Sequence, residues 1–265
     1  MKINHEPDGN FPNGVPNPLL PERRLVTAEA VREHQADMGI AWDGDFDRCF
    51  LYDENGEFVS AYYVSGLLAA NFLDKHPGSK IVCDTRLCWN TLDIVEKGKG
   101  VPVKSRTGHV FFKSAMRQHD AIYGGEVSAH HYFRDFASCD SGMLPWLLVA
   151  EHMSVTGKSL AELVADRIAL FKCSDEINFE VGDPAMVVAA VAETYEASAR
   201  QIDHSDGISV EFERWRFSLR MSNTEPLLRL NVEARADSGL VAKKLSEVAG
   251  LIERLATRHH GPIPT

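Results

Sequence analysis

The chain has 265 residues, 44% apolar and 25% charged, which is the balance of a folded globular protein and excludes a disordered or collagen-like one. Lys and Arg number 28 against 38 Asp and Glu, so the formal net charge is −10 and nucleic acid is not an expected partner. The apolar runs fall short of the roughly 20 residues that span a bilayer. The N-terminus lacks the apolar stretch of a secretory signal, so no membrane partner and a cytoplasmic location are expected.

The first 60 residues predict irregular chain followed by short elements. Proline and Asn-Gly or Asp-Gly turns fill residues 1–24 and exclude continuous helix there. The expected elements are a helix over 27–35 with Thr27 as its N-cap, and strands at 38–42, 49–52 and 58–63. The five cysteines form an odd set without a Cys-x-x-Cys pair, which indicates small buried side chains instead of disulfides or a zinc site.

From about residue 60 the chain alternates between helical and strand patterns. The expected helices are 65–75, 88–97, 109–119, 142–153 and 158–170, and the expected strands are 79–84, 101–106 and 121–127. This order is typical of a βαβ domain with a mainly parallel sheet. After residue 172 we expect a helix begun by Asp183-Pro184, antiparallel strands within 209–236 and a last helix with an apolar stripe. The predicted fold class is mixed, mainly parallel α/β, followed by a small α+β domain.

The acidic loop Asp-Gly-Asp-Phe-Asp-Arg at 43–48 is the strongest chemical signal. Asp43, Asp45 and Asp47 alternate as the chain leaves a strand, so their carboxylates can converge on a hard divalent cation, with Arg48 beside it as a phosphate clamp. An acidic turn solvated at a sheet edge is the simpler alternative. An EF-hand with Glu54 as its last ligand fails, because position six is Arg48 where that loop needs glycine and the flanks are strands instead of helices.

Two further segments carry groups suited to a phosphorylated sugar. In Gly-Gly-Glu-Val-Ser-Ala-His at 124–130, Glu126, Ser128 and His130 offer an acceptor, a hydroxyl and an imidazole to neighbouring hydroxyls, unless they form only a polar strand edge. In Arg-Met-Ser-Asn-Thr-Glu-Pro at 220–226, a guanidinium, hydroxyls and an amide could bind a phosphate dianion, although such a segment also forms ordinary turns. The candidates there are Arg220, Ser222, Asn223 and Thr224.

These three motifs, in this order, resemble the metal-binding, sugar-binding and C-terminal phosphate-binding loops of the α-D-phosphohexomutases, the family of phosphomannomutases and phosphoglucomutases. The resemblance covers the whole chain and is strongest to bacterial phosphomannomutases that supply GDP-mannose for surface polysaccharides. It implies an intramolecular phosphotransferase that interconverts hexose 1-phosphate and hexose 6-phosphate, with mannose and glucose left open. It also implies Mg²⁺ at Asp43, Asp45 and Asp47.

The resemblance adds two positions and assigns roles. It implies catalytic roles for Arg48, His109 and His130, and substrate contacts for His109 and Arg86, with a surface arginine as the alternative for Arg86. By the same resemblance, residues 1–57 correspond to the end of the family's second domain, 58–171 to its third and 172–265 to its fourth.

The family's first domain carries a phosphoserine in a Thr-Ala-Ser-His-Asn-Pro-like loop, and no such loop occurs in these 265 residues. Two functions are therefore expected to compete. One is a mutase, completed by further residues of a longer chain or by a separately encoded N-terminal half. The other is an inactive phosphosugar-binding fragment, and in either case we expect the chain alone to be inactive.

Overall fold

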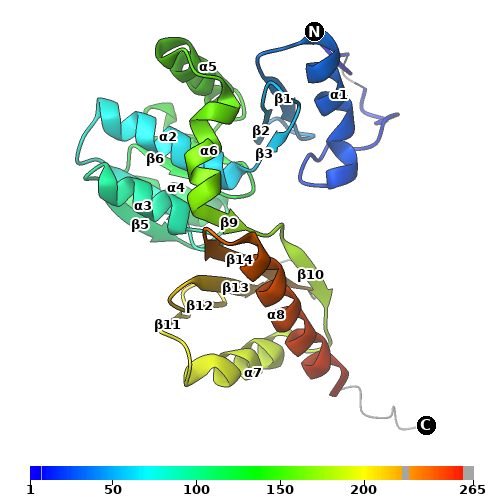
Figure 1. Ribbon diagram of the computed structural model, residues 1–265, viewed down its shortest axis with the longest axis vertical. Helices are drawn as coiled ribbons and strands as arrows, with labels where there is room; N and C mark the ends of the chain where they lie inside the picture. The colour runs from blue at the N-terminus through cyan, green and yellow to red at the C-terminus, as the bar shows by residue number, and fades with distance from the viewer. Residues whose placement is uncertain (7, 223–226, 259–265) are drawn as a thin grey trace. The chain divides into compact units, whose positions relative to one another are not determined.

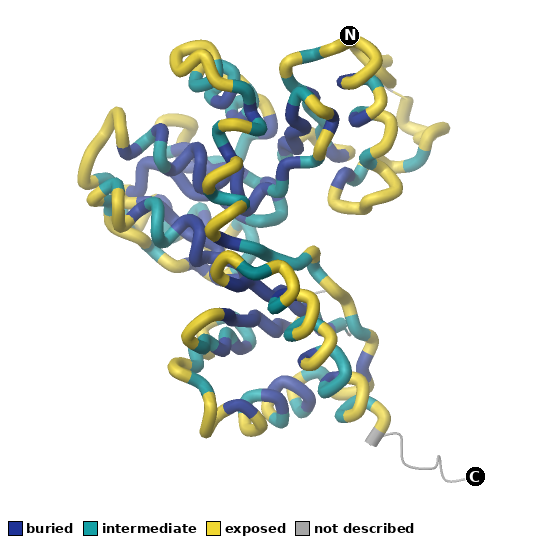
Figure 2. Tube along the Cα trace, viewed as in Figure 1, coloured by how far each residue is buried: buried dark blue, intermediate teal, exposed yellow. Residues whose placement is uncertain are grey.

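In the computed structural model the described residues are 1–6, 8–222 and 227–258, and they divide into two compact units (Figure 1). Unit 1 comprises Met1–Asp84 and Asn90–Arg167, and unit 2 comprises Thr85–Trp89 and Ile168–Thr265. Among the described residues, no helix is both long and apolar enough to cross a membrane. Figure 2 shows that each unit has its own buried interior beneath exposed helix faces and loops.

Unit 1 begins with irregular chain and a small antiparallel sheet, as expected. Its first elements are the 3-10 turn Pro21–Arg23, α1 (Leu25–His34), β1 (Gly39–Trp42), β2 (Cys49–Tyr52) and β3 (Phe58–Val59). The predicted start of α1 at Thr27 is wrong, because the 3-10 turn continues directly through Arg24 into the helix without a side-chain cap. The predicted strand at 58–63 is also too long. Ser60 caps α2 there, and its hydroxyl accepts a hydrogen bond from the Tyr62 N–H at 3.3 Å.

The second sheet of unit 1 is mixed, in the order β5-β4-β6-β7-β8. Its strands are β4 (Lys80–Asp84), β5 (Val101–Ser105), β6 (Tyr123–Gly125), β7 (His131–Phe133) and β8 (Cys139–Asp140). The helices after β3 are α2 (Ala61–Lys75), α3 (Trp89–Lys97), α4 (His109–His119), α5 (Leu144–Thr156) and α6 (Leu160–Leu170). Strand β4 pairs in parallel with β5 and β6, as the helical crossovers require, whereas the short loops after β6 and β7 make those pairs antiparallel.

Two adjacent glycines set the close packing of helices on this sheet. A Cβ on Gly124 would lie 3.0 Å from Val82 and 3.2 Å from the Met116 sulfur of α4, and a Cβ on Gly125 would lie 2.5 Å from the Ser65 hydroxyl of α2. Neighbouring strand residues point to opposite faces, so α4 and α2 cover opposite faces of the sheet. Side-chain atoms of the protein therefore fill the space beside Gly124 and Gly125, and no room is left there for a ligand.

Unit 2 is an antiparallel sheet in the order β10-β14-β13-β12-β11, with β9 pairing the end of β14. Its elements are β9 (Phe171–Cys173), β10 (Ile177–Glu180), α7 (Pro184–Glu196), β11 (Gln201–Asp203), β12 (Ile208–Glu211), β13 (Trp215–Met221), β14 (Leu227–Arg235) and α8 (Ser238–Arg258). The expected cap is confirmed, since the Asp183 carboxylate accepts a hydrogen bond from the Met186 N–H at 3.0 Å. Valines of α7 and α8 pack on one sheet face against Phe217, Leu219 and Leu230.

The opposite face of β13 and β14 is polar and yet buried. Alternate residues place Arg216 opposite Glu233 and Arg220 opposite Arg229 across the two strands. Arg216, Arg220 and Glu233 are 3%, 7% and 0% exposed. Charged groups are almost never buried unless they are paired, so this face needs partners for every charge.

Candidate functional site

The acidic loop of unit 1 is the turn of the β1–β2 hairpin. Trp42 pairs with Cys49, so residues 43–48 close the hairpin between two strands, as expected. Arg48 holds the loop shut, because its backbone N–H donates to Asp43 Oδ1 at 3.2 Å and its Nε to Asp43 Oδ2 at 2.6 Å. One carboxylate oxygen of each of Asp43, Asp45 and Asp47 lies within 4.8 Å of the others. Three hard oxygen donors at this spacing fit a divalent cation such as Mg²⁺.

Aromatic packing fixes the conformation of this loop. Phe46 has a φ of +64°, a left-handed conformation that is uncommon outside glycine, and its ring stacks on Trp42 with centroids 5.5 Å apart. The Trp42 indole N–H donates to the Gly142 carbonyl oxygen at 2.8 Å, so the loop is tied to the chain before α5. Burial raises the pKa of Asp43 above its usual value, while the Arg48 hydrogen bond opposes that shift.

The second loop, between β6 and β7, is built around a buried carboxylate. Glu126 is 2% exposed, and its Oε2 accepts a hydrogen bond from the Ser128 hydroxyl at 2.7 Å while its Oε1 accepts one from the Tyr132 hydroxyl at 2.9 Å. Burial, followed by the charge of Glu126, raises the pKa of Tyr132. Ala129 has a φ of +73°, a left-handed conformation that is uncommon for residues other than glycine. Ser128 and His130 are thereby held beside Glu126.

The two loops meet through their backbones. Arg48 and His130 form an isolated antiparallel bridge, and the Cys49 N–H donates to the Ala129 carbonyl oxygen at 3.2 Å. His130 Nε2 lies 3.4 Å from Asp47 Oδ2. The structure therefore brings together the residues predicted for metal, sugar and proton transfer in unit 1, although their roles remain predictions.

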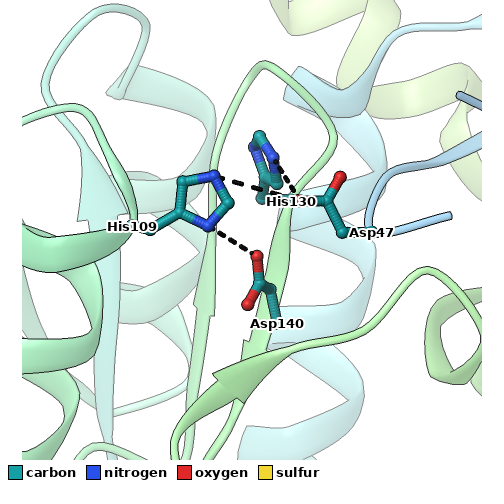
Figure 3. A group of neighbouring side chains, drawn as sticks. All are labelled: Asp47, His109, His130 and Asp140. Carbon is teal, nitrogen blue, oxygen red and sulfur yellow. Dashed lines mark ion pairs between the residues drawn. The ribbon is translucent and has the colours of Figure 1, made fainter. Parts of the chain in front are cut away.

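His109, the first residue of α4, completes this group (Figure 3). Its Nδ1 lies 2.8 Å from Asp140 Oδ2, its Nε2 lies 4.0 Å from Asp47 Oδ2, and its ring meets His130 edge-on at 4.4 Å between centroids. Burial tends to raise the pKa of Asp140, but the Lys113 ammonium at 2.8 Å and His109 hold it below its usual value. Asp47, His109, His130 and Asp140 are also close enough to hold a metal.

The predicted phosphate-binding residues lie in unit 2 as far as the structure describes them. Arg220 is near the end of β13, and the Ser222 N–H donates to the Leu227 carbonyl oxygen at 2.8 Å. Asn223 and Thr224 lie outside the described residues. Arg86 is 4% exposed, which excludes the alternative of a surface arginine. Burial, followed by the charge of Arg86, lowers the pKa of Arg220.

Sequence reasoning missed three groups that contact these residues. Asp140 Oδ2 lies 2.8 Å from His109 Nδ1, and Glu176 lies 3.7 Å from Arg86 and Arg220. Asp84 accepts a hydrogen bond at 3.1 Å from the N–H of Val127, between Glu126 and Ser128. None stands in a recognisable local motif, because each reaches its partner only through the tertiary fold. Of the three, only Asp84 could have been suspected from its position, because it ends a parallel strand and ligands bind beyond the carboxyl ends of such strands.

Comparisons with known proteins agree with this architecture. Family models described as phosphoglucomutase/phosphomannomutase domain II, domain III and C-terminal domain match residues 1–56, 61–171 and 176–251. A phosphomannomutase of Escherichia coli is 60% identical over 253 residues, which are 96% of this chain and 56% of the relative. A Xanthomonas campestris protein named for phosphohexose mutases is 57% identical, covering 95% of this chain and 56% of the relative.

A solved structure of a phosphoglucomutase/phosphomannomutase family protein from Burkholderia thailandensis shares the fold, with a TM-score of 0.84 at 25% identity, over 96% of this chain and 54% of that one. A mixed α/β unit and an antiparallel α+β unit are thus the shared architecture of a group of sugar-phosphate enzymes. The chain belongs to the phosphoglucomutase/phosphomannomutase family, the α-D-phosphohexomutases. It spans about half the length of the curated relatives it matches. The domain boundaries expected at 57/58 and 171/172 remain a prediction.

Proposed function

We propose that this chain provides the metal loop, the sugar-reading loop and the phosphate-binding arginines of a mutase that interconverts hexose 1-phosphate and hexose 6-phosphate. Mannose phosphates are the proposed substrates, with glucose phosphates as the alternative. The mannose 1-phosphate formed would be used to make GDP-mannose for surface polysaccharide. The observation that carries the proposal is the backbone bridge between Arg48 and His130, because it joins a divalent-cation loop to a loop of hydroxyl-binding groups. The names of relatives at 57–60% identity support it.

The residues of unit 1 suit the proposed reaction. Asp43, Asp45 and Asp47 would hold Mg²⁺, which when bound offsets negative charge on a phosphoryl group. Arg48 keeps its guanidinium at this loop and adds positive charge for the same purpose. Ser128 would bind a sugar hydroxyl, with the Glu126 carboxylate as the acceptor that orients it.

His109 is the proposed group for moving the hydroxyl proton. With Nδ1 turned to Asp140, the neutral ring carries its proton on Nδ1 and leaves Nε2 as a proton acceptor on the side of the metal loop. His130 Nε2 lies near the same Asp47 carboxylate and would bind substrate or share the proton transfer. This division of roles stays a proposal for both histidines.

Binding and turnover can be tested on the chain as it stands. Ligand-observed NMR with mannose 6-phosphate and glucose 6-phosphate in the presence of Mg²⁺ should show saturable, weak binding. Glu126→Gln should lose the hexose phosphates and keep inorganic phosphate, whereas Arg220→Ala should lose both. Glu29→Gln is a matched control, because Glu29 is exposed on α1. If Glu126→Gln and Arg220→Ala both bind like the parent, the proposed sites are wrong.

A coupled assay for mannose 6-phosphate formation from mannose 1-phosphate, with glucose 1,6-bisphosphate as activator, then separates catalysis from binding. We expect no turnover by the 265 residues alone, since no serine among them stands in the family's phosphoserine-type loop. Turnover on addition of a serine-bearing N-terminal half would support the mutase. Binding that never leads to turnover with any such half would favour the inactive phosphosugar-binding fragment.

A further inference from the structure

Unit 2 contains a cluster of like charges around the carboxylate of Glu176. Arg220 and Arg229 stand directly opposite each other on β13 and β14, a cross-strand arrangement of like charges that is destabilising by itself. Arg86 comes from the segment Thr85–Trp89 of the same unit. All three guanidinium groups lie within 4.0 Å of Glu176, the residue just before β10.

Glu176 contacts the three arginines unequally. Its Oε1 accepts a hydrogen bond from Arg229 Nη1 at 3.1 Å, but its Oε2 lies 3.7 Å from both Arg86 Nη1 and Arg220 Nη2, which is too long for a hydrogen bond. Oε2 is buried and has no hydrogen-bond partner among the described residues. Three guanidinium groups therefore lie around Glu176, and its Oε2 makes no hydrogen bond to Arg86 or Arg220.

The burial and charge of these arginines favour the binding of an anion beside them. The side chains of Arg86 and Arg220 are 5% and 8% exposed, so both charges are largely removed from water. The buried Nε of Arg220 has no hydrogen-bond partner in the part of the chain that the structure describes. Burial, then the charges of Arg86 and Arg229, lowers the pKa of Arg220, while Glu176 and Asp206 oppose that shift only in part. Buried cations in this state favour a bound dianion.

We propose that the Glu176 carboxylate competes with phosphate for the phosphate-binding arginines. It interacts with Arg86 and Arg220 when no phosphate is bound, and its negative charge lowers the affinity of the site for the phosphate that replaces it. The inference rests on the proposed function, because it assumes that these arginines bind the phosphate of the substrate. Its consequence is that the site binds phosphate less tightly than its three guanidiniums would alone. A site that must release a phosphorylated sugar in every cycle benefits from such a limit on affinity.

The test compares inorganic phosphate binding by the parent chain, Glu176→Gln and Glu180→Gln at constant ionic strength, using ³¹P NMR line broadening and calorimetry. Glu180 is an exposed carboxylate at the other end of β10, so its variant makes the same change in net charge away from the arginines. Removing one charge a few ångströms from a phosphate should tighten binding about tenfold in Glu176→Gln, and Glu180→Gln should stay within about twofold of the parent.

Glu176→Gln should also be less stable than the parent without phosphate, because the arginines then repel one another, and it should gain more thermal stability from added phosphate. If that variant does not fold, Glu176→Asp provides the measurement, since it keeps the charge but withdraws it from Arg86 and Arg220. Unchanged or weaker phosphate binding in the folded variant overturns the proposal and makes Glu176 a residue that only orients the arginines.

Arg220→Ala separates this inference from the proposed function. If Arg220→Ala binds phosphate as the parent does, the phosphate site itself is wrong. If Arg220→Ala loses binding and the Glu176 variants show no gain, the site stands and only the competition is refuted.

Discussion

Replacing Glu233 with glutamine tests a deeply buried ion pair of unit 2. Glu233 is 0% exposed and pairs with Arg216 Nη1 at 2.5 Å, while its two oxygens also accept the Cys88 and Trp89 N–H groups at 2.8 and 3.1 Å. Arg216 in turn donates to the backbone carbonyl oxygens of Thr85 and Arg86 at 2.8 and 3.0 Å. The substitution keeps the shape of the side chain and removes its charge.

The expected cost follows from what remains in place. Arg216 stays buried and charged, and breaking a buried pair by removing one partner costs about 3–5 kcal/mol. The side-chain amide introduced by Glu233→Gln keeps one oxygen for the Cys88 or Trp89 N–H, so we expect the lower end, about 3 kcal/mol of unfolding free energy. Arg214→Gln is the control, because Arg214 is 65% exposed and its pair with Asp237 at 3.4 Å is worth at most about 1 kcal/mol.

Hydrogen exchange of peptides from β13 and β14, followed by mass spectrometry across a urea series, measures the stability of this unit directly. Exchange in the Glu233→Gln protein should be faster by about two powers of ten than in the parent, and that in Arg214→Gln by less than one. Equal protection in the two variants would refute the argument that this pair holds the sheet to residues 85–89.

Three further outcomes are expected. Burial lowers the pKa of His131 to about 3 in the folded protein, below the unfolded value of about 6.5, so between these pH values only the unfolded chain is protonated at this residue. In urea titrations the unfolding free energy of the parent should fall by about 2 kcal/mol more than that of His131→Phe between pH 6.5 and 5. Parallel curves for the two proteins would contradict this. Asp45→Ala should weaken Mg²⁺ binding in calorimetry at least about tenfold while the exposed Asp37→Ala does not, and tight Ca²⁺ binding with indifference to Mg²⁺ would revive the EF-hand interpretation. In Asp140→Asn, long-range ¹H–¹⁵N NMR at high pH should find the neutral His109 proton moved from Nδ1 towards Nε2, and an unchanged tautomer would mean that Asp140 does not orient the ring.

Local sequence patterns predicted most elements of the fold. The helix at 109–119 and the strand at 49–52 are confirmed. The strand is a short run of four buried apolar residues, and the helix buries residues one turn apart, Phe112 and Met116. The predicted boundaries are wrong where a neighbouring element or cap sets the start of a helix. Helix α1 continues directly from a 3-10 turn, and Ser60 caps α2, so residues 61–63 are helical and not part of a strand. The antiparallel half of the second sheet could not be read from periodicity, because pairing direction depends on loop lengths.

The candidate site was predictable where its residues are close in sequence. Asp43, Asp45 and Asp47 share one hairpin loop, and Glu126 and Ser128 share another. Glu176, in contrast, meets its arginines only after separate segments of the chain have come together in the folded sheet. The sequence 174–177 carries no pattern that would have distinguished this carboxylate from an exposed one.

The segment Thr85–Trp89 affects how unit 2 can be made. Arg216 needs two carbonyl oxygens of this segment, and Glu233 needs two of its N–H groups. A protein truncated to residues 168–265 would thus expose an arginine and a glutamate that have lost their neighbours, and we expect it to aggregate or stay unfolded. During synthesis, residues 85–89 leave the ribosome well before β13 and β14 exist, so their backbone groups cannot bind Arg216 and Glu233 until β14 has been translated.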